Sequence, residues 1–234
     1  MAALRPPFAP ERLLDLSETA HASLFLQVSW VWEALTRIGP YLADRLEPAI
    51  LGEVSAQATV GPRVRIGKGS VVDAGAVVLG PAWIGEHCSI RPGAFVRQNV
   101  IVGDRCVLGN SCEFKNALLL NGAQVPHFNY VGDSILGAHT HLGAGAILSN
   151  LRLRGDEVRV RFGEEVFSTG LRKFGAVLGD QAQVGCNAVL NPGSILGRKS
   201  LVHPGVAWSG YLPEGAVAKA ATRPIVIEDA SIDR

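Results

Sequence analysis

The sequence predicts an all-β protein built as a parallel β-helix, with a short helical cap before it and one hairpin projecting from it. Large apolar residues recur at every sixth position over residues 54–120, and a small residue follows most of them four positions later. Helices repeat every ~3.6 residues and half-buried strands every second residue, whereas six residues make one short strand and a corner. Stacked coils of such repeats bury a continuous ladder of side chains. The apolar positions are Val54, Val60, Ile66, Val72, Val78, Ile84, Ile90, Val96, Val102, Leu108, Phe114 and Leu120.

Three of the small positions are cysteines: Cys88, Cys106 and Cys112. Cys88 and Cys106 lie eighteen residues apart, so a coil of three hexads would stack them in adjacent coils. The favoured interpretation is small buried thiols in a reducing compartment, which predicts a cytoplasmic protein. A disulfide or a metal site is the alternative at these positions.

Residues 1–48 lack the six-residue period and are predicted to form an N-terminal helical cap. Ser17 and Ser29 are candidate N-caps of short amphipathic helices. Trp30 and Trp32 are interpreted as core residues rather than as a platform for a ligand. Because a solenoid must cover its first coil, this segment is expected to lie over that end.

The β-helix is predicted over residues 49–212, and Pro213 and Gly215 are taken to mark the start of a polar tail at 213–234. The period is interrupted at 126–130 and again at about 150–174. In the second interruption, residues 151–154 and 158–162 alternate in period 2 around a Gly-Asp-Glu turn, which predicts a projecting hairpin. The period returns at Val131, Leu136, Leu142 and Leu148, and later at Leu178, Val184, Leu190, Leu196 and Val202.

The charges are nearly balanced, with 22 Lys and Arg residues against 21 Asp and Glu residues and a net charge of +1. This balance argues against a general nucleic-acid surface. The most apolar stretch, residues 22–32, is too short to span a bilayer, and no charged leader with an apolar run opens the sequence. We therefore expect neither a nucleic-acid nor a membrane partner.

The segment His127-x-x-Tyr130-x-Gly132-Asp133 is the most specific motif, and Leu-Gly-Ala-Gly-Ala at 142–146 follows it. It resembles the acetyltransferase domain of bifunctional UDP-N-acetylglucosamine pyrophosphorylase/glucosamine-1-phosphate N-acetyltransferase, and that of related sugar-1-phosphate nucleotidyltransferases. The resemblance runs from about residue 54 to 224. It implies a left-handed β-helix, a homotrimer with active sites at the subunit boundaries, and acetyl-CoA as co-substrate with no metal required.

The resemblance also implies roles for single residues. His127 stands where the family has a general base, which takes a proton from the sugar amine as it attacks acetyl-CoA. An imidazole suits this step because its ordinary pKa, about 6.5, lies near the working pH. The implied substrate-binding residues are Arg91, Lys115, Tyr130, His141 and Lys173, of which Lys173 reaches a neighbouring chain's site. The implied CoA-binding positions are Ala144, Asn150, Leu151, Cys186, Pro204 and Arg223.

The chain departs from the family pattern in three places. His141 replaces a substrate-binding Asn, which leaves the acceptor sugar open because the two side chains offer different donors. Cys186 replaces a serine. The hairpin is longer than in the bifunctional enzyme, and its arginines either bind an anion or keep an exposed edge soluble. These arginines are Arg152, Arg154, Arg159 and Arg161.

A metal site is the alternative reading of His139 and His141, which would share one side of a strand. It would suggest a trimer like the carbonic anhydrases that use a left-handed β-helix. That family needs three histidines, including a pair five residues apart, and the sequence has none so placed. The favoured reading is therefore metal-free.

The sequence thus predicts an acetyl-CoA-dependent N-acetyltransferase for an amino-sugar phosphate, with glucosamine 1-phosphate the leading candidate, in nucleotide-sugar and cell-envelope precursor synthesis. No Gly-rich nucleotide-binding loop precedes the β-helix, so the chain is not expected to make a nucleotide sugar by itself. One alternative is a non-catalytic β-helix that docks on a separate nucleotidyltransferase through its N-terminal cap. Another is an acyltransferase with a different amino-sugar acceptor.

Overall fold

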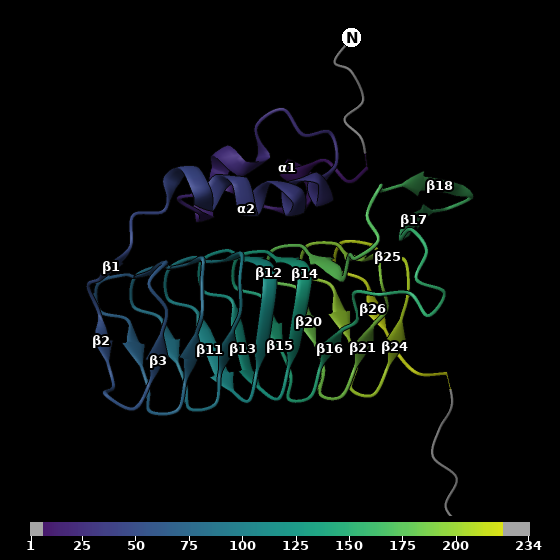
Figure 1. Cartoon of the computed structure of the whole chain (residues 1–234). Helices are drawn as coiled ribbons and strands as arrows, with labels where there is room; N and C mark the ends of the chain where they lie inside the picture. The colour runs from purple at the N-terminus through teal and green to yellow at the C-terminus, as the bar shows by residue number, and fades with distance from the viewer. Residues whose placement is uncertain (1–6, 222–234) are drawn as a thin grey trace, which may run out of the picture.

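The computed structural model describes residues 7–221, which form a parallel β-helix with an N-terminal helical segment along one side (Figure 1). Each coil passes through three faces in turn, and we call them the first, second and third face in chain order. The corner that follows each face takes the same number. This solenoid confirms the predicted left-handed hexapeptide-repeat fold.

The strands are short and pair in parallel from coil to coil. The first face holds β1 (Ala49–Ile50), β4 (Val64–Ile66), β7 (Ala82–Ile84), β10 (Val100–Val102), β19 (Ala176–Leu178), β22 (Ser194–Leu196) and β25 (Tyr211–Leu212). The second face holds β2 (Glu53–Val54), β5 (Val71–Val72), β8 (Ser89–Ile90), β11 (Val107–Asn110), β13 (Gln124–His127), β15 (His141–Leu142), β20 (Gln183–Val184), β23 (Leu201–Val202) and β26 (Val217–Ala218). The third face holds β3 (Thr59–Val60), β6 (Val77–Val78), β9 (Phe95–Val96), β16 (Ile147–Leu148), β21 (Val189–Leu190) and β24 (Ala207–Trp208). Two longer strands, β12 (Glu113–Leu119) and β14 (Tyr130–Leu136), turn the third corner unbroken and serve both the third and first faces.

The lumen of the solenoid is filled by the six-residue repeat. Ile84, Ile90 and Phe114 are fully buried there, one from each face. The predicted small positions Cys88 and Cys106 are buried in adjacent coils, because Ser89 pairs with Val107 one coil on. Each large aliphatic side chain buried in this way contributes roughly 1.5–3 kcal/mol.

One predicted lumen position is wrong, because the coil shortens. Ile84 pairs with Val102 eighteen residues on, but Val102 pairs with Leu119 only seventeen residues on. Leu119 therefore points into the lumen in place of Leu120. Leu120 is fully buried outside the solenoid, against the N-terminal segment.

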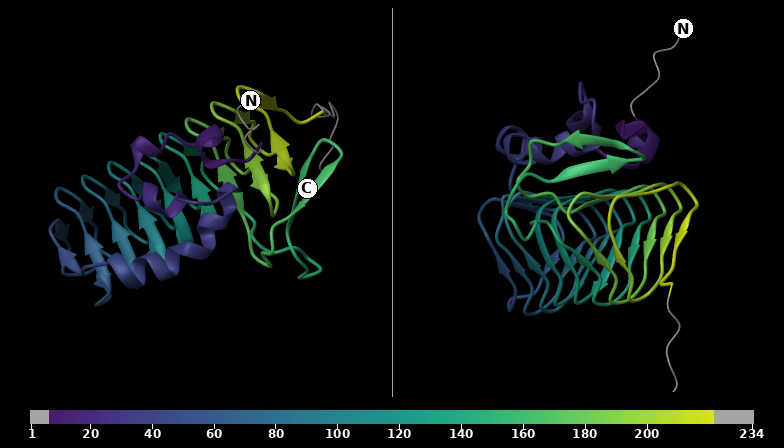
Figure 2. Two further views of the ribbon diagram at one scale, coloured as in Figure 1. Left: turned by 90° about the horizontal axis from the view of Figure 1, so that it is seen from above. Right: turned by 90° about the vertical axis from the view of Figure 1, so that its right-hand side faces the viewer.

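The N-terminal segment covers the first face rather than the first coil, which corrects the expected position of the cap. The middle residue of each three-residue strand on that face points outward, since side chains alternate along a strand. These outward residues pair in register from coil to coil, and the N-terminal segment packs on them (Figure 2, left). At the first coil, by contrast, Ile50 and Leu51 are 51% and 54% exposed. The outward ladder is Ile101, Leu118, Ile135, Val177 and Ile195.

The segment itself consists of short helical turns and one longer helix. Trp32 is buried in the layer between segment and face, and its ring stacks on Trp30 at 5.3 Å, as core tryptophans would. The predicted serine caps are wrong. Asp15 caps the turn at 16–18 and accepts the Ser17 backbone N–H at 3.0 Å, whereas the backbone N–H of Ser29 donates to the carboxylate of Glu33 at 2.8 Å. The helices are α1 (Pro10–Leu13), η1 (Leu16–Glu18), η2 (Ala22–Phe25), η3 (Val31–Glu33) and α2 (Ala34–Arg45).

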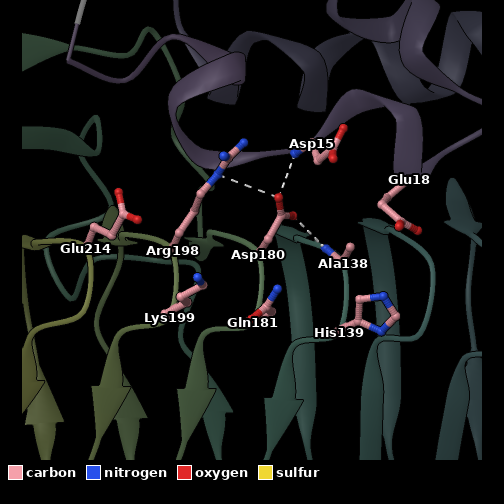
Figure 3. A pocket seen from close by; sticks show the side chains of 9 residues that line it. All are labelled: Asp15, Glu18, Ala138, His139, Asp180, Gln181, Arg198, Lys199 and Glu214. Atoms are coloured by element: carbon pink, nitrogen blue, oxygen red, sulfur yellow. Dashed lines mark hydrogen bonds and ion pairs between the residues drawn. The ribbon is translucent and has the colours of Figure 1, made fainter.

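A buried carboxylate fixes the segment to the solenoid at the first corner (Figure 3). Asp180 accepts the backbone N–H of Asp15 at 2.6 Å and that of Ala138 at 2.8 Å. Arg198 lies 3.6 Å away on the other side. Asp180 thus joins two coils of the β-helix to a residue more than 160 positions earlier in the chain.

The projecting hairpin is confirmed, but its first strand was predicted too early. It is formed by β17 (Arg159–Phe162) and β18 (Glu165–Ser168), and residues 151–154 belong to neither strand. Leu151 instead bridges to Lys173 at the point where the insertion leaves and rejoins the solenoid. The solenoid also continues past residue 212, because β26 adds a ninth strand to the second face. Pro213 and Gly215 therefore lie in the turn before β26 rather than at the exit.

None of the helices within residues 7–221 has the length and apolar character needed to cross a membrane.

A buried histidine of the N-terminal segment lies against the first face. The ring of His21 is 3% exposed, meets the ring of Trp83 edge-on at 4.9 Å, and has its Nδ1 3.0 Å from the Tyr41 hydroxyl. Burial lowers the pKa of His21 to about 4. The folded protein therefore holds this imidazole neutral at a pH where the unfolded chain protonates it.

We predict that acidification destabilises the protein through His21. The unfolded chain takes up this proton near pH 6.5 and the folded protein only near pH 4, so the free energy of unfolding falls between these values. The loss from this group is about 3 kcal/mol. Urea unfolding at several pH values measures it, and His21→Phe, which keeps the aromatic packing, should flatten that part of the profile. An unchanged profile in the variant would contradict the assignment.

Candidate active site

The predicted base and three of the predicted CoA-binding positions form one column along the second corner. Backbone hydrogen bonds join them coil by coil: the carbonyl of His127 accepts from Gly145 at 3.0 Å, that of Ala144 from Asn187 at 2.9 Å, and that of Cys186 from Gly205 at 2.9 Å. Each bond joins a corner residue to the residue that follows its register partner in the next coil. The register partners themselves form the column, which consists of His127, Ala144, Cys186 and Pro204.

A shallow cavity of about 270 Å³ lies beside the later part of this column. Cys186 and Pro204 line it from the corner, and His141 lines it from the second face. The remaining lining comes from register partners of His141 and their neighbours. They are Gly143, Gln183, Val184, Gly185, Leu201, Val202 and His203.

The imidazole of His127 is exposed at the end of β13, on a backbone that is held in place. The backbone N–H of His127 donates to Oδ1 of Asn129 at 3.1 Å. Asn129 is 2% exposed and donates to the carbonyls of Gly143 and Ala146 inside the corner. A buried amide therefore fixes the loop, while the ring of His127 faces outward from the solenoid.

A second polar group, which we call the third-corner cluster, gathers around Asp133. Lys115 lies 3.4 Å from its carboxylate, and the amide of Asn116 donates to Oδ1 at 3.0 Å. Nδ2 of Asn150 contacts both Oδ2 of Asp133, at 2.5 Å, and the Tyr130 hydroxyl, at 3.1 Å. The cluster brings together Lys115, Tyr130 and Asn150, for which ligand-binding roles were predicted. Asp133 is part of the sequence motif, but no role was predicted for it.

The phenol of Tyr130 is kept protonated in this cluster. Partial burial raises its pKa, and the negative charge of Asp133 adds to the rise. Tyr130 can therefore donate a hydrogen bond to an anionic ligand. Its ring lies over Gly132, where an added Cβ would meet the hydroxyl at 2.5 Å, so the glycine makes room for it.

The structure separates two cations that the sequence treated as a pair. Arg91 follows β8 and stands at the second corner, whereas Lys115 stands at the third. The arginine that shares the column of Lys115 is Arg97, because Val96 pairs with Phe114. Arg97 forms an ion pair with Glu113 at 2.8 Å and was not singled out from the sequence. The eighteen-residue spacing of Arg97 and Lys115 is the signal that could have found it.

The remaining predicted positions divide between the two corners. Lys173 is exposed and bridges to Leu151 beside the third-corner cluster, so Leu151 lies apart from Ala144 and the column of the second corner. The backbone N–H of Phe174 donates to the carbonyl of Asn150 at 2.9 Å and ties the insertion to the same cluster. Arg223 falls outside the described residues.

The paired-histidine metal reading does not fit the backbone. His141 begins β15, whereas His139 lies in the turn before it with a φ of 56°, so the two do not share a strand. In the part of the chain that the structure describes, no three His, Cys, Asp or Glu side chains are grouped closely enough to hold a metal ion.

Fold and site together define a hexapeptide-repeat β-helix with an exposed imidazole at one corner and a Lys-Tyr-Asn cluster at another. Comparison with known proteins confirms the resemblance seen in the motifs. The sequence family described as the GMPPB C-terminal domain matches residues 78–170. A bifunctional sugar-1-phosphate nucleotidylyltransferase/acetyltransferase from Sulfurisphaera tokodaii is 32% identical over 155 residues, which is 66% of this chain and 39% of the relative. The bifunctional protein GlmU of Methanococcus vannielii is 33% identical over 172 residues, 73% of this chain and 41% of the relative.

The chain thus spans about two fifths of the length of these relatives. Among solved structures, a UDP-N-acetylglucosamine acyltransferase from Francisella novicida superposes with a TM-score of 0.46 at 13% identity, covering 73% of this chain and 66% of that one.

We predict that acetyl-CoA protects Cys186 from alkylation. Cys186 is the one exposed cysteine of the four and lines the cavity of the second corner, so a pantetheine arm in this cavity would cover the thiol. The rate of iodoacetamide labelling, followed by mass spectrometry, should fall at saturating acetyl-CoA. Cys186→Ser should remove the fast-reacting thiol and serves as control. Equal labelling rates with and without acetyl-CoA would contradict this placement.

Proposed function

We propose that the protein is an acetyl-CoA-dependent N-acetyltransferase that acts on an amino-sugar phosphate, with glucosamine 1-phosphate as the leading acceptor. The observation that carries the proposal is the column of the second corner, in which an exposed imidazole on a fixed backbone continues into a cavity lined by Cys186 and Pro204. The relative from Sulfurisphaera tokodaii, which is named as a bifunctional sugar-1-phosphate nucleotidylyltransferase/acetyltransferase, supports the same chemistry.

In the proposed reaction, the amine nitrogen of the sugar attacks the thioester carbonyl carbon of acetyl-CoA. A C–N bond forms and the C–S bond breaks. His127 takes the proton that the amine loses, and the departing CoA thiolate takes a proton in turn. No acyl-enzyme and no metal take part in this step. Ala144, Cys186 and Pro204 would hold the pantetheine arm along the corner.

The acceptor is proposed to bind at a boundary between subunits of a homotrimer. His127 and the third-corner cluster lie at opposite edges of the third face of one chain, so a single subunit does not bring them together. A neighbour whose third corner meets the second corner of this chain would complete the site. Lys115, Tyr130 and Lys173 would then bind the sugar phosphate from one chain, while His127, Arg91 and His141 would face it from the other.

The alternative of a docking protein for a separate nucleotidyltransferase gains no support from the N-terminal segment. Its apolar side chains, including Trp32 and Ile38, are packed on the first face of the same chain. A non-catalytic protein would also have no need for the exposed imidazole of the second corner. Purified protein incubated with acetyl-CoA and a panel of amino-sugar phosphates and nucleotide-linked amino sugars tests the proposal and identifies the acceptor. No release of free CoA thiol above background with any acceptor would contradict it.

We predict that His127→Ala lowers the rate of acetyl transfer by about 10²–10⁴-fold, the usual worth of a general base. Gln124→Ala provides the matched control, because Gln124 is exposed on the same strand and has no role in the proposed reaction. Release of CoA thiol measures the rate. An unaffected rate in His127→Ala, with the oligomer intact, would remove the assigned role.

We predict that two inactive variants restore activity when their subunits mix. His127→Ala lacks the base but keeps the third-corner cluster, and Lys115→Met keeps the base. In every mixed trimer, one of the three boundaries joins an intact His127 to an intact Lys115, so the mixed oligomer should recover about a third of wild-type activity. Co-expression with two different affinity tags, followed by purification on both, supplies the mixed oligomer. No recovery in an oligomer shown to be mixed would mean that His127 and Lys115 do not act at a shared boundary.

A further inference from the structure

The hairpin presents arginines from a fixed base. Val158 and Val160 are fully buried against the N-terminal segment and the first face. Side chains alternate along β17, so Arg159 and Arg161 lie on the side opposite Val160. The base is also tight: a Cβ on Gly193 would meet Cγ1 of Val158 at 2.8 Å. Arg159 and Arg161 are therefore carried by a strand that is anchored at the solenoid.

Two adjoining cavities open beside these arginines at the third corner. One, of about 340 Å³, is lined by Arg152, Arg159 and Arg161 together with Asn191. The other, of about 440 Å³, is lined by Arg152 and Arg154 and shares Asn191 with the first. Within residues 7–221, no Asp or Glu lines either cavity. Four arginines thus line two adjoining cavities that share Arg152 and Asn191.

The arginines are only partly neutralised by their own neighbours. Arg152 pairs with Asp156 at 3.0 Å, and Arg159 lies 3.7 Å from Glu157. Within residues 7–221, Arg154 and Arg161 have neither an ion pair nor a hydrogen bond through their side chains. The cavity of the first corner differs, since Asp15, Glu18, Asp180 and Glu214 line it beside its cations.

We infer that the hairpin cavities bind the phosphate groups of an anionic ligand, with more than one phosphate. A guanidinium group offers paired N–H donors that match phosphate oxygens, and it stays charged at any working pH. Four of them in connected cavities exceed what a single monophosphate needs. For Arg159 and Arg161, the fixed base of the hairpin lowers the cost of ordering the side chains around the ligand.

CoA carries such groups, and so does a nucleotide-linked amino sugar, which is the alternative acceptor to an amino-sugar phosphate. The inference rests on the proposed function only for choosing between these two ligands. The hairpin adjoins the third-corner cluster, because Ser149 and Leu151 line the second cavity on either side of Asn150. The phosphates are therefore those of a nucleotide-linked acceptor held by that cluster, or those of CoA bound to a neighbouring chain. Binding of inorganic pyrophosphate tests the site without any acetyl transfer.

Calorimetric titration of the wild-type oligomer with sodium pyrophosphate should show saturable binding that weakens as salt concentration rises. Arg154→Gln/Arg161→Gln should weaken it by tenfold or more, because each lost charge-assisted bond typically matters on that order. Both residues are exposed and unpaired, so the variant should keep its fold, which its melting temperature checks. Arg63→Gln, an exposed arginine near the first coils, is the matched control. Equal pyrophosphate binding in the two variants, or no saturable binding in the wild type, would overturn the inference.

The source of the phosphates follows from a second titration, with CoA. If CoA binding weakens in Arg154→Gln/Arg161→Gln together with pyrophosphate binding, the site takes the CoA phosphates. If CoA binding is unchanged while pyrophosphate binding is lost, the site takes the phosphates of the acceptor. Either result supports the site, and both remain measurable if the acetyl-transfer proposal fails.

Discussion

The stacking of the lumen side chains is the constraint on which the rest of the structure depends. Parallel strand pairing fixes each coil against the next, and every coil must place an apolar side chain inward from each face. Residues one coil apart are therefore neighbours, however the coils are joined. The insertion of the hairpin shows this, because Leu136 still pairs with Leu178 on its far side. Positions in the solenoid thus act as columns, and a site can be assembled from residues far apart in the sequence.

The six-residue period was enough to predict the fold, because it reports directly on what the lumen requires. It could not report on the length of a coil where leucines follow one another, as they do at 118–120. Leu119 and Leu120 are both apolar, so a coil that is one residue shorter still places a leucine in the lumen. The six-residue pattern therefore does not reveal the shortening. The period also says nothing of outward positions. The apolar middle residues Ile101 and Leu118 were the available signal that the first face is covered.

The residues of the candidate site that belong to a recognisable motif could be predicted from the sequence. His127 and Tyr130 came from the motif, and Ala144, Cys186 and Pro204 from the resemblance; the structure adds that four of these five share one column. Arg91 and Lys115 were predicted as a pair, but the structure separates them. Their spacing of twenty-four residues equals one coil plus one face, so they stand at different corners of the solenoid. The position of Arg97 next to Lys115 could have been predicted from the sequence, because the two residues are one coil of eighteen residues apart. Whether two chains meet at the third face does not follow from any single chain, because the complementary corner belongs to another copy.

The position of the N-terminal segment has a consequence for how the chain can be divided. The outward ladder through Ile101, Ile135 and Ile195 is an apolar stripe that crosses successive coils. It is shielded from solvent only because Trp32, Ile38 and their neighbours pack on it. A fragment starting at Ala49 would retain a complete lumen but bear that stripe in contact with water. The helices are thus an integral wall of the folded unit, and the repeats alone do not delimit it.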